Sequence, residues 1–210
     1  MTGAAPRFTT SGARTSVAIR EAAAKLFYEQ GYEATSLRGV ASEVDLRVGS
    51  LYNHIKGKED LLADIMLSVL NDLLELVTAS IEAAGPTLFE KFTSAMDCHI
   101  RYHAEHAREV FIGNSELRSL SPNNLAMILA KRAEYERLLH ELIISLSEET
   151  GANILDAKLQ TYAVLAQGAH VSSWYRSSGS KSLDKVVSTY IRLAVRQLGI
   201  ERGVPAMVGD

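Results

Sequence analysis

The feature of the sequence that most restricts the fold is one long stretch of helix-forming residues, from Lys58 to about Ala84. Leucine, isoleucine, valine and methionine recur in it every three or four residues, which is the period of an α-helix. These apolar residues cover too wide a face for a helix that meets water on most sides, so other helices must enclose it. Helical spacing also dominates the rest of the chain, and no alternating strand pattern of useful length occurs. The sequence therefore predicts an all-α protein.

Glycine, proline and short polar segments divide the chain into separate helices. Gly31 ends the first helix, and Thr35 or Ser36 caps the second. A Gly-Pro pair at residues 85–86 separates the long helix from the helices that follow. The expected helices cover residues 14–30, 36–44, 47–54, 58–84, 87–105, 107–118, 122–149, 155–177 and 183–198.

Composition excludes several classes of protein. A chain of 210 residues with 47% apolar residues can bury a substantial core. Its beginning, MTGAAPRFTTSGARTS, lacks the apolar run of a signal peptide, and no later stretch approaches the roughly 18 apolar residues of a membrane span. The single cysteine, Cys98, allows no internal disulfide framework. We therefore expect a cytoplasmic protein that makes no contact with a membrane.

The charges are unevenly distributed, although the net charge is only −3. That net charge argues against a protein that coats nucleic acid non-specifically. However, Arg7, Arg14 and Arg20 come before the first acidic residue, and further basic residues lie in the 38–58 segment. Because acidic residues are interspersed there, a basic face must arise from folding rather than from composition.

Residues 36–55 fit two short helices joined by a tight turn, which is the helix-turn-helix arrangement. In the second of these helices Leu51 and Ile55 face inward, and the remaining side chains offer hydrogen-bond donors to DNA. Small Gly49 would let backbone N–H groups approach a phosphate, whereas arginine and asparagine side chains read base edges. The candidate DNA-contact residues are Thr35, Ser36, Arg38, Arg47, Val48, Gly49, Ser50, Tyr52, Asn53, His54 and Lys58. Alternatively, Tyr52 braces the motif against the long helix, His54 is an internal packing residue and Lys58 is merely solvated.

The stretch FYEQGYEATSLRGVASEVDLRVGSLYNHIKGKEDLL resembles the TetR family of bacterial transcriptional regulators, with a match over about residues 14–64. Two positions depart from the family pattern. Asp45 stands where the family usually has a turn glycine, and Ile55 where it usually has an aromatic residue. Aspartate tolerates a left-handed backbone better than most residues, so the turn should survive. The expected division is an N-terminal arm (1–13), a DNA-binding domain (14–57), a connecting helix (58–84), a ligand-binding and dimerisation domain (85–200) and a tail (201–210).

The resemblance implies a ligand pocket among the C-terminal helices. An apolar cavity with a few polar groups would suit a largely apolar effector. The candidate effector-binding residues are Met66, His99, Tyr102, His103, Phe111, Tyr135, Tyr162, His170, Trp174 and Arg176, although core packing would also explain most of them. The segment around Trp174 and Arg176 looks like the penultimate helix end of a TetR subgroup that responds to acyl-coenzyme A thioesters. In that case Arg176 and Lys181 would meet phosphates of the ligand.

The spacing of three histidines raises the question of a metal site. His99, His103 and His106 share one helix face with Cys98 nearby, which formally suits a metal ion. Because no carboxylate completes the set, we expect neither a metal nor a cofactor. Phosphate-binding glycine loops, serine elbows and paired cysteines are also missing from the sequence. The sequence therefore gives no support for an enzyme.

The resemblance also implies that the last two helices pair across a two-fold axis. The penultimate helix offers small residues and the last one an apolar face. The candidate dimerisation residues are Ala163, Ala166, Ala169, Val187, Tyr190, Ile191, Ala194, Val195 and Leu198; alternatively, these faces close the core of the monomer. We therefore expect a homodimeric repressor with its two 47–54 helices in successive major grooves of a palindromic operator, about 34 Å apart. The other possibility is an all-helical protein that binds a small ligand without affinity for an operator.

Overall fold

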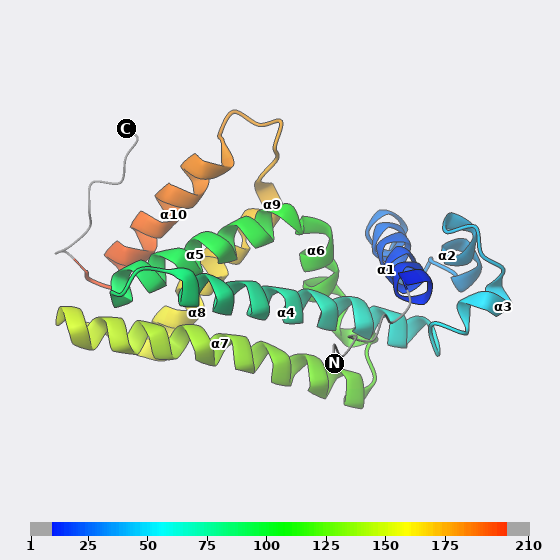
Figure 1. The fold of residues 1–210 in the computed structure, drawn as a ribbon, viewed down its shortest axis with the longest axis horizontal. Coiled ribbons are helices and arrows are strands. Elements are labelled where there is room, and N and C mark those ends of the chain that lie inside the picture. The colour runs from blue at the N-terminus through cyan, green and yellow to red at the C-terminus, as the bar shows by residue number, and fades with distance from the viewer. Residues whose placement is uncertain (1–9, 201–210) are drawn as a thin grey trace, which may run out of the picture.

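The computed structural model describes residues 10–200, and every regular element in that range is a helix, as expected (Figure 1). The elements are α1 (Thr10–Gln30), α2 (Leu37–Glu43), α3 (Val48–Leu51), α4 (Lys58–Ala83), α5 (Leu88–Glu105), α6 (Ala107–Ser115), the 3₁₀ turn η1 (Leu117–Ser119), α7 (Pro122–Thr150), α8 (Ala157–Ala169), α9 (Val171–Trp174) and α10 (Leu183–Gln197). The molecule is elongated, with α1–α3 at one end and α10 toward the other (Figure 1). No helix within this range is long and apolar enough to cross a membrane.

The first helix begins at Thr10, four residues before the expected start. The expected start was placed just ahead of the apolar stripe, whereas residues 10–13 are small or polar and carry no stripe. Residues 10–13, which were expected to belong to the N-terminal arm, are therefore part of α1. Arg7, the rest of the arm and the tail at 201–210 lie outside the described residues.

The turn between α2 and α3 has the geometry that the sequence predicted. Ser36 caps α2 by accepting a hydrogen bond from the Gly39 backbone N–H at 3.1 Å. Asp45 adopts the left-handed conformation with a φ of 53°. The expected two-turn helix over 47–54 is shorter: α3 ends at Leu51, and hydrogen-bonded turns such as His54 N to Leu51 O (2.9 Å) continue it.

The long helix α4 runs along much of the molecule with α7 beside it and connects two hydrophobic cores (Figure 1). Its first half packs with α1–α3 in the N-terminal core, to which Ile112 of α6, Leu120 directly after η1 and Ile128 of α7 also belong. Its second half contributes Leu73 and Val77 to the C-terminal core, which α5, α7, α8 and α10 complete. The helix-turn-helix end therefore shares a core with helices of the second domain.

Two of the expected C-terminal helices are interrupted. The helix expected over 155–177 ends at Ala169, His170 forms the junction, and the short α9 ends at Trp174. The helix expected over 107–118 ends at Ser115 and is followed by η1. The remaining C-terminal helices begin and end within two residues of the expected positions.

Candidate DNA-contact surface and ligand cavity

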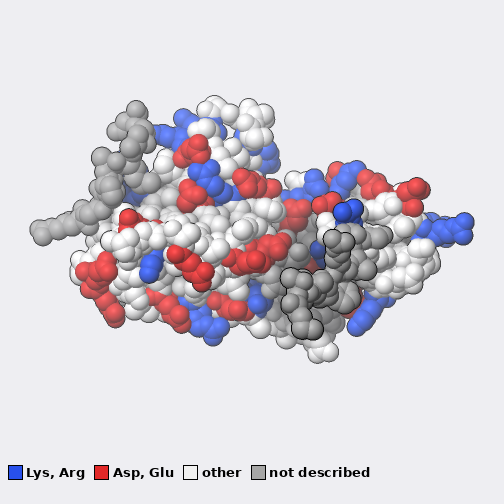
Figure 2. Space-filling view, in the orientation of Figure 1, with Lys and Arg blue, Asp and Glu red and all other residues white. Residues whose placement is uncertain are grey.

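The surface around α3 exposes several of the predicted DNA-contact residues. Arg47, Gly49 and Asn53 are exposed, and the Tyr52 side chain is 54% exposed although Leu51 beside it is fully buried. Arg38 on α2 is exposed too. Lys and Arg side chains project from this end of the molecule with acidic side chains among them (Figure 2). The arrangement thus presents donors for phosphates and base edges on one helix and its flanking turns.

Thr35 is a correction to the predicted contact set. The residue is only 3% exposed, and its one hydroxyl hydrogen is shared between the carbonyl oxygens of Gly31 (2.9 Å) and Leu26 (3.2 Å). It lies between the end of α1 and the start of α2, where a small residue with a hydroxyl satisfies two carbonyls. Thr35 therefore supports the helix-turn-helix from inside, whereas the neighbouring Ser36 is exposed.

Two other predicted contacts have partners within the protein. The Lys58 ammonium donates to the carbonyl oxygens of Thr35 (3.0 Å) and Glu33 (3.2 Å) and lies 4.3 Å from the centroid of the Tyr32 ring. His54 Nδ1 is 3.2 Å from the Ser16 hydroxyl on α1. Both side chains are half-buried, as are Val48 and Ser50. His54 thus holds the turn after α3 against α1, which agrees with its packing alternative, and Lys58 holds the start of α4 against the loop between α1 and α2.

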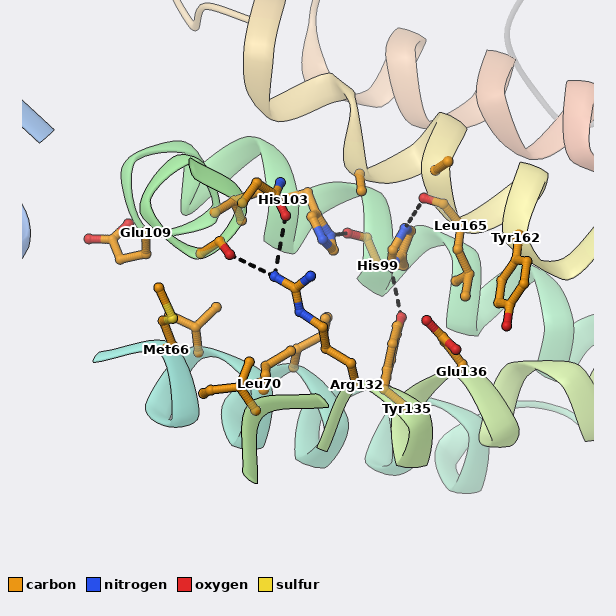
Figure 3. Close-up of a pocket in the computed structure, with 18 residues that line it drawn as sticks. Met66, Leu70, His99, His103, Glu109, Arg132, Tyr135, Glu136, Tyr162 and Leu165 are labelled. Carbon is orange, nitrogen blue, oxygen red and sulfur yellow. Dashed lines mark hydrogen bonds between the residues drawn. The ribbon is translucent and has the colours of Figure 1, made fainter. Parts of the chain in front are cut away.

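A cavity of about 280 Å³ lies between α4, α5, α6, α7 and α8 (Figure 3). Most of its wall is apolar, from side chains such as Met66, Val69, Leu70, Leu73, Val110, Ile128 and Leu165. Its polar side chains are His99, His103, Glu109, Asn114, Arg132, Tyr135, Glu136 and Tyr162. An apolar enclosure with a few polar groups is typical of a site for a small organic ligand.

Two histidines on α5 form a hydrogen-bonded network at the cavity wall (Figure 3). His99 Nδ1 is 2.7 Å from the Tyr135 hydroxyl, and its Nε2 is 3.1 Å from the Leu165 carbonyl oxygen. His103 Nδ1 is 2.8 Å from the His99 carbonyl oxygen. Burial lowers the pKa of His103 to about 4 and holds the pKa of His99 well below its ordinary value, with His103 adding to the effect on His99. Both rings are therefore neutral near pH 7.

Arg132 is the main cavity residue that the sequence interpretation missed. Its Nη2 donates to the Gly113 carbonyl oxygen at 2.7 Å, at the end of α6, and to the Asn114 side-chain oxygen at 3.4 Å (Figure 3). Burial lowers the pKa of its guanidinium, while Glu136 raises it. The signal was present, because Ile128, Arg132 and Tyr135 lie on one helical stripe, where an arginine is unusual. The carboxylates Glu109 and Glu136 were missed as well.

The structure separates the ten predicted effector residues into groups. Met66, His99, His103, Tyr135 and Tyr162 line the cavity. Phe111, His170 and Arg176 do not line it; they line a second hollow of about 590 Å³, which shares Asn114, Ala166 and Ala169 with the cavity.

Tyr102 and Trp174 also lie outside the cavity. The Tyr102 hydroxyl donates to the Val69 carbonyl oxygen at 3.0 Å, on the side of α5 that faces α4 and α1. Trp174 packs against Tyr190, with 6.1 Å between ring centroids, so its ring has a structural contact on α10. Tyr102 is next to His103 in sequence, so the helix turns the two side chains in different directions.

The histidines of α5 are engaged in packing and backbone contacts. His106 stacks on Tyr102 at 4.0 Å between centroids, and its Nδ1 is 2.9 Å from the Tyr102 carbonyl oxygen. Cys98 is half-buried, and burial raises the pKa of its thiol. Within residues 10–200, no three or more histidine, cysteine, aspartate or glutamate side chains come together as metal ligands would.

The predicted dimer face of the last helix is wrong in its main part. Its apolar residues close the core of the chain itself, because five of them are at most 3% exposed: Val187, Ile191, Ala194, Val195 and Leu198. Tyr190 is half-buried against Trp174. On α8, Ala163 and Ala166 are exposed, whereas Ala169 is half-buried between the two hollows. The alternative, in which the α10 face closes the monomer, therefore holds.

A helix-turn-helix with exposed polar residues around its second helix, joined by one long helix to an all-helical domain with a cavity, is the architecture of a DNA-binding transcriptional regulator. Residues 19–65 match the family model described as bacterial regulatory proteins of the tetR family. Residues 85–198, more than half of the chain, match the model described as the tetracyclin repressor-like C-terminal domain. The chain belongs to the TetR family of transcriptional regulators.

Known proteins with similar sequences and folds support this assignment. The HTH-type transcriptional repressor KstR2 of Rhodococcus jostii is 28% identical over 191 residues, which cover 88% of this chain and 90% of KstR2. A tetR-family regulatory protein from Rhodococcus RHA1 has a crystal structure with a TM-score of 0.81 at 28% identity, covering 91% of this chain and 99% of that one. AibR, crystallised with isovaleryl coenzyme A and operator DNA, shares the fold with a TM-score of 0.76 at 24% identity, over 85% of this chain and 96% of AibR. These relatives are transcriptional regulators rather than enzymes, as the sequence predicted.

Proposed function

We propose that this protein is a repressor that binds a palindromic operator as a homodimer and is released when a largely apolar effector fills the cavity. One observation carries the proposal: a single helix serves both sites. α4 begins at Lys58, directly after the turns that follow α3, and its residues Met66, Val69 and Leu70 form part of the cavity wall. Met66 is eight residues beyond Lys58, or about 12 Å along the helix axis.

The exposed residues around α3 support contact with the major groove. Arg47, Gly49, Tyr52 and Asn53 are exposed. In the proposed complex Arg47 and Asn53 would reach base edges, and Tyr52 and the backbone at Gly49 would meet the phosphates beside them. In a two-fold dimer, two such helices meet successive major grooves about 34 Å apart. We place the protein in the cytoplasm because it acts there on chromosomal DNA.

Release follows if the effector favours a different position of α4. A ligand that fits the cavity better in one arrangement of α4, α6 and α7 shifts the population toward that arrangement. Because α4 carries α3 at its beginning, the spacing of the two reading helices changes and operator affinity falls.

The exposed apolar residues of α8 and α10 support a dimer face different from the one that the sequence suggested. Leu159 is 64% exposed, and Tyr162 and Leu193 are about 40% exposed, with Ala163 exposed beside them. Two helices from each copy, packed through this face, would remove these side chains from water.

The two adjoining hollows favour an acyl-coenzyme A thioester as effector. The acyl group would occupy the inner cavity, and the nucleotide would lie in the outer hollow beside Arg176 and His170, with the exposed Lys181 nearby in sequence. AibR, which shares the fold, has been crystallised with such a thioester. Isovaleryl and octanoyl coenzyme A are suitable probes: each should dissociate the operator complex of the wild type, and Arg176→Ala should raise the concentration needed.

Mobility shifts with genomic DNA fragments at several salt concentrations test operator binding. We expect a specific complex whose affinity falls steeply with salt, because phosphate contacts release counterions. The variant with Arg47→Ala and Tyr52→Ala should lose the shift, whereas Arg137→Ala, an exposed arginine on α7, should bind like the wild type. No binding of the wild type to any fragment would instead favour the ligand-binding protein without operator affinity.

A further inference from the structure

The His103 ring presents an unpaired nitrogen to the cavity. Its Nδ1 lies 2.8 Å from the His99 carbonyl oxygen, and because a carbonyl only accepts, Nδ1 carries the hydrogen. Its Nε2 has no hydrogen-bond partner among the described residues. Of the fully enclosed side-chain nitrogen and oxygen atoms in that part of the chain, only Gln160 Oε1 is unpaired. The Nε2 atom is therefore open to the cavity that the ring lines (Figure 3).

The ring is neutral, which makes this nitrogen a hydrogen-bond acceptor. His103 is 8% exposed, and its ring centroid is 4.3 Å from that of His99. Burial in such surroundings disfavours the imidazolium and lowers the pKa of His103 to about 4. A neutral imidazole with its hydrogen on Nδ1 has a lone pair on Nε2.

The ring nitrogens of His99 and Nη2 of Arg132, both in the same cavity wall, are already paired. His99 Nε2 must donate to the Leu165 carbonyl oxygen, so its Nδ1 accepts from the Tyr135 hydroxyl. Arg132 donates to Gly113 and Asn114 at the end of α6.

The charges that line the cavity disfavour an anion. Two carboxylates, Glu109 and Glu136, outnumber the single guanidinium of Arg132, and neither histidine adds a positive charge. A carboxylate placed inside would therefore meet a net negative wall at low dielectric.

We propose that His103 selects the effector: the part that enters the inner cavity is uncharged and apolar, and it donates a hydroxyl or amide N–H to His103 Nε2. This inference rests on the proposed function, because it specifies the chemistry of the effector for that cavity. An uncharged acyl group that carries a hydroxyl satisfies it, and so does a free apolar alcohol. Unsubstituted acyl groups such as isovaleryl and octanoyl fill the cavity without this donor and should bind more weakly than their hydroxylated forms.

Calorimetric titration of the full chain without DNA tests the selection with three probes of similar size. 1-Octanol has a donor hydroxyl, its isomer 1-methoxyheptane has only an acceptor oxygen, and octanoate is an anion. We expect 1-octanol to bind about three- to tenfold more tightly than the ether, the usual range for one net hydrogen bond. Octanoate should bind more weakly than 1-octanol.

Two variants assign the preference to one atom. His103→Phe keeps an aromatic ring but removes the acceptor, so the alcohol and the ether should bind about equally. His106→Phe is the matched control. Like His103, His106 has its Nδ1 at hydrogen-bond distance from the carbonyl oxygen four residues earlier, but it does not line the cavity. It should keep the wild-type preference, with far-UV circular dichroism verifying that both variants are folded.

Several outcomes would overturn the proposal. For the wild type, these are equal affinities for the alcohol and the ether, a higher affinity for octanoate than for the other two probes, or no binding of any probe. For His103→Phe, it is a preference for the alcohol that remains. Loss of the preference in His106→Phe would overturn it as well. The titrations contain no DNA, so a negative result in them would not count against operator binding. In the same way, a failure of the mobility shifts would not count against the role of His103.

Discussion

The Glu59 carboxylate, in the first turn of α4, accepts a hydrogen bond of 2.7 Å from the side-chain amide of Asn124, in the first turn of α7. The same oxygen accepts from the Ser121 backbone N–H, also at 2.7 Å. α4 starts beside the DNA-contact end, and α7 continues into the cavity wall at Arg132 and Tyr135. The two helices that join the proposed sites are therefore fastened together at their beginnings.

Glu59→Gln should weaken this fastening in a pH-dependent way. Hydrogen bonds from Ser121 and Asn124 hold the pKa of Glu59 below its ordinary value. Its contribution to folding is therefore complete above the unfolded pKa of about 4.3 and is lost as pH falls through the lower folded pKa. Thermal unfolding at a series of pH values should show the variant melting below the wild type near neutrality, with the two curves converging in acid.

Glu90→Gln is the control for Glu59. The pKa of Glu90 is also lowered, by hydrogen bonds to Thr87 within the capping box of α5, so its carboxylate binds at the start of its own helix. Both variants should lose thermal stability, and only Glu59→Gln should alter operator affinity. An unchanged affinity in Glu59→Gln would show that the link between α4 and α7 does not position the reading helix.

Lys58→Ala should destabilise the helix-turn-helix end by about 1–2 kcal/mol, because two carbonyl oxygens lose their donor and Tyr32 loses its cation. Urea unfolding measures this loss. Lys56→Ala, which removes an exposed lysine two residues earlier, should leave stability nearly unchanged. If Lys58 acts only at a DNA phosphate, its removal will weaken operator binding and leave the unfolding midpoint where it was.

Asp45→Ala should cost about 1 kcal/mol, because alanine tolerates a φ of 53° poorly and has no polar side chain to compensate. Asp45→Gly should be at least as stable as the wild type, since glycine adopts this conformation without strain. Urea midpoints for the three proteins give the order directly. A wild type more stable than both variants would mean that the Asp45 side chain contributes a specific interaction.

Local sequence signals predicted the elements whose boundaries depend on nearby residues. The Ser36 cap, the left-handed Asp45 turn and the buried Leu51 all follow from short-range rules, and the structure confirms them. The start of α1 was misplaced because residues 10–13 carry no apolar stripe. The junction at His170 was missed because the residues around it form helices on both sides and contain no proline.

Helical periodicity shows that one face of a helix is apolar but not which other helix packs against it. Most errors in the predicted site residues have this cause. The stripe that contains Val187 and Ile191 is apolar whether it packs on another copy or on α5 and α8 of the same chain. Likewise, His103 and Tyr102 are adjacent in sequence, yet only His103 lines the cavity. Arg132 was overlooked because a basic residue normally indicates a solvated face, and only the three-dimensional packing shows that it lines the cavity half-buried.

Gly168→Ala should destabilise the protein by about 1–3 kcal/mol and disturb the cavity. A Cβ atom at Gly168 would lie 2.5 Å from His99 Cδ2 and 2.8 Å from its Nε2, so the buried ring would have to move away from Leu165 and Tyr135. Gly113→Ala is the matched control, because its added Cβ would meet Arg132 no closer than 3.8 Å. That helical substitution should be neutral or stabilising in thermal unfolding. Equal effects of the two substitutions would mean that His99 has room to shift.

His103→Leu should make the free energy of unfolding depend less on pH between neutral pH and about pH 4.5. The folded pKa of His103 is about 4, whereas an unfolded histidine titrates near 6.5. The unfolded chain therefore gains a proton first, and the wild type should lose on the order of 3 kcal/mol as pH falls through this window. His99 is coupled to His103 and keeps part of the slope in the variant. The window lies above that of Glu59, so urea midpoints at closely spaced pH values separate the two effects. If the wild type and His103→Leu show the same slope, His103 is not held neutral, and the acceptor assigned to its Nε2 loses its basis.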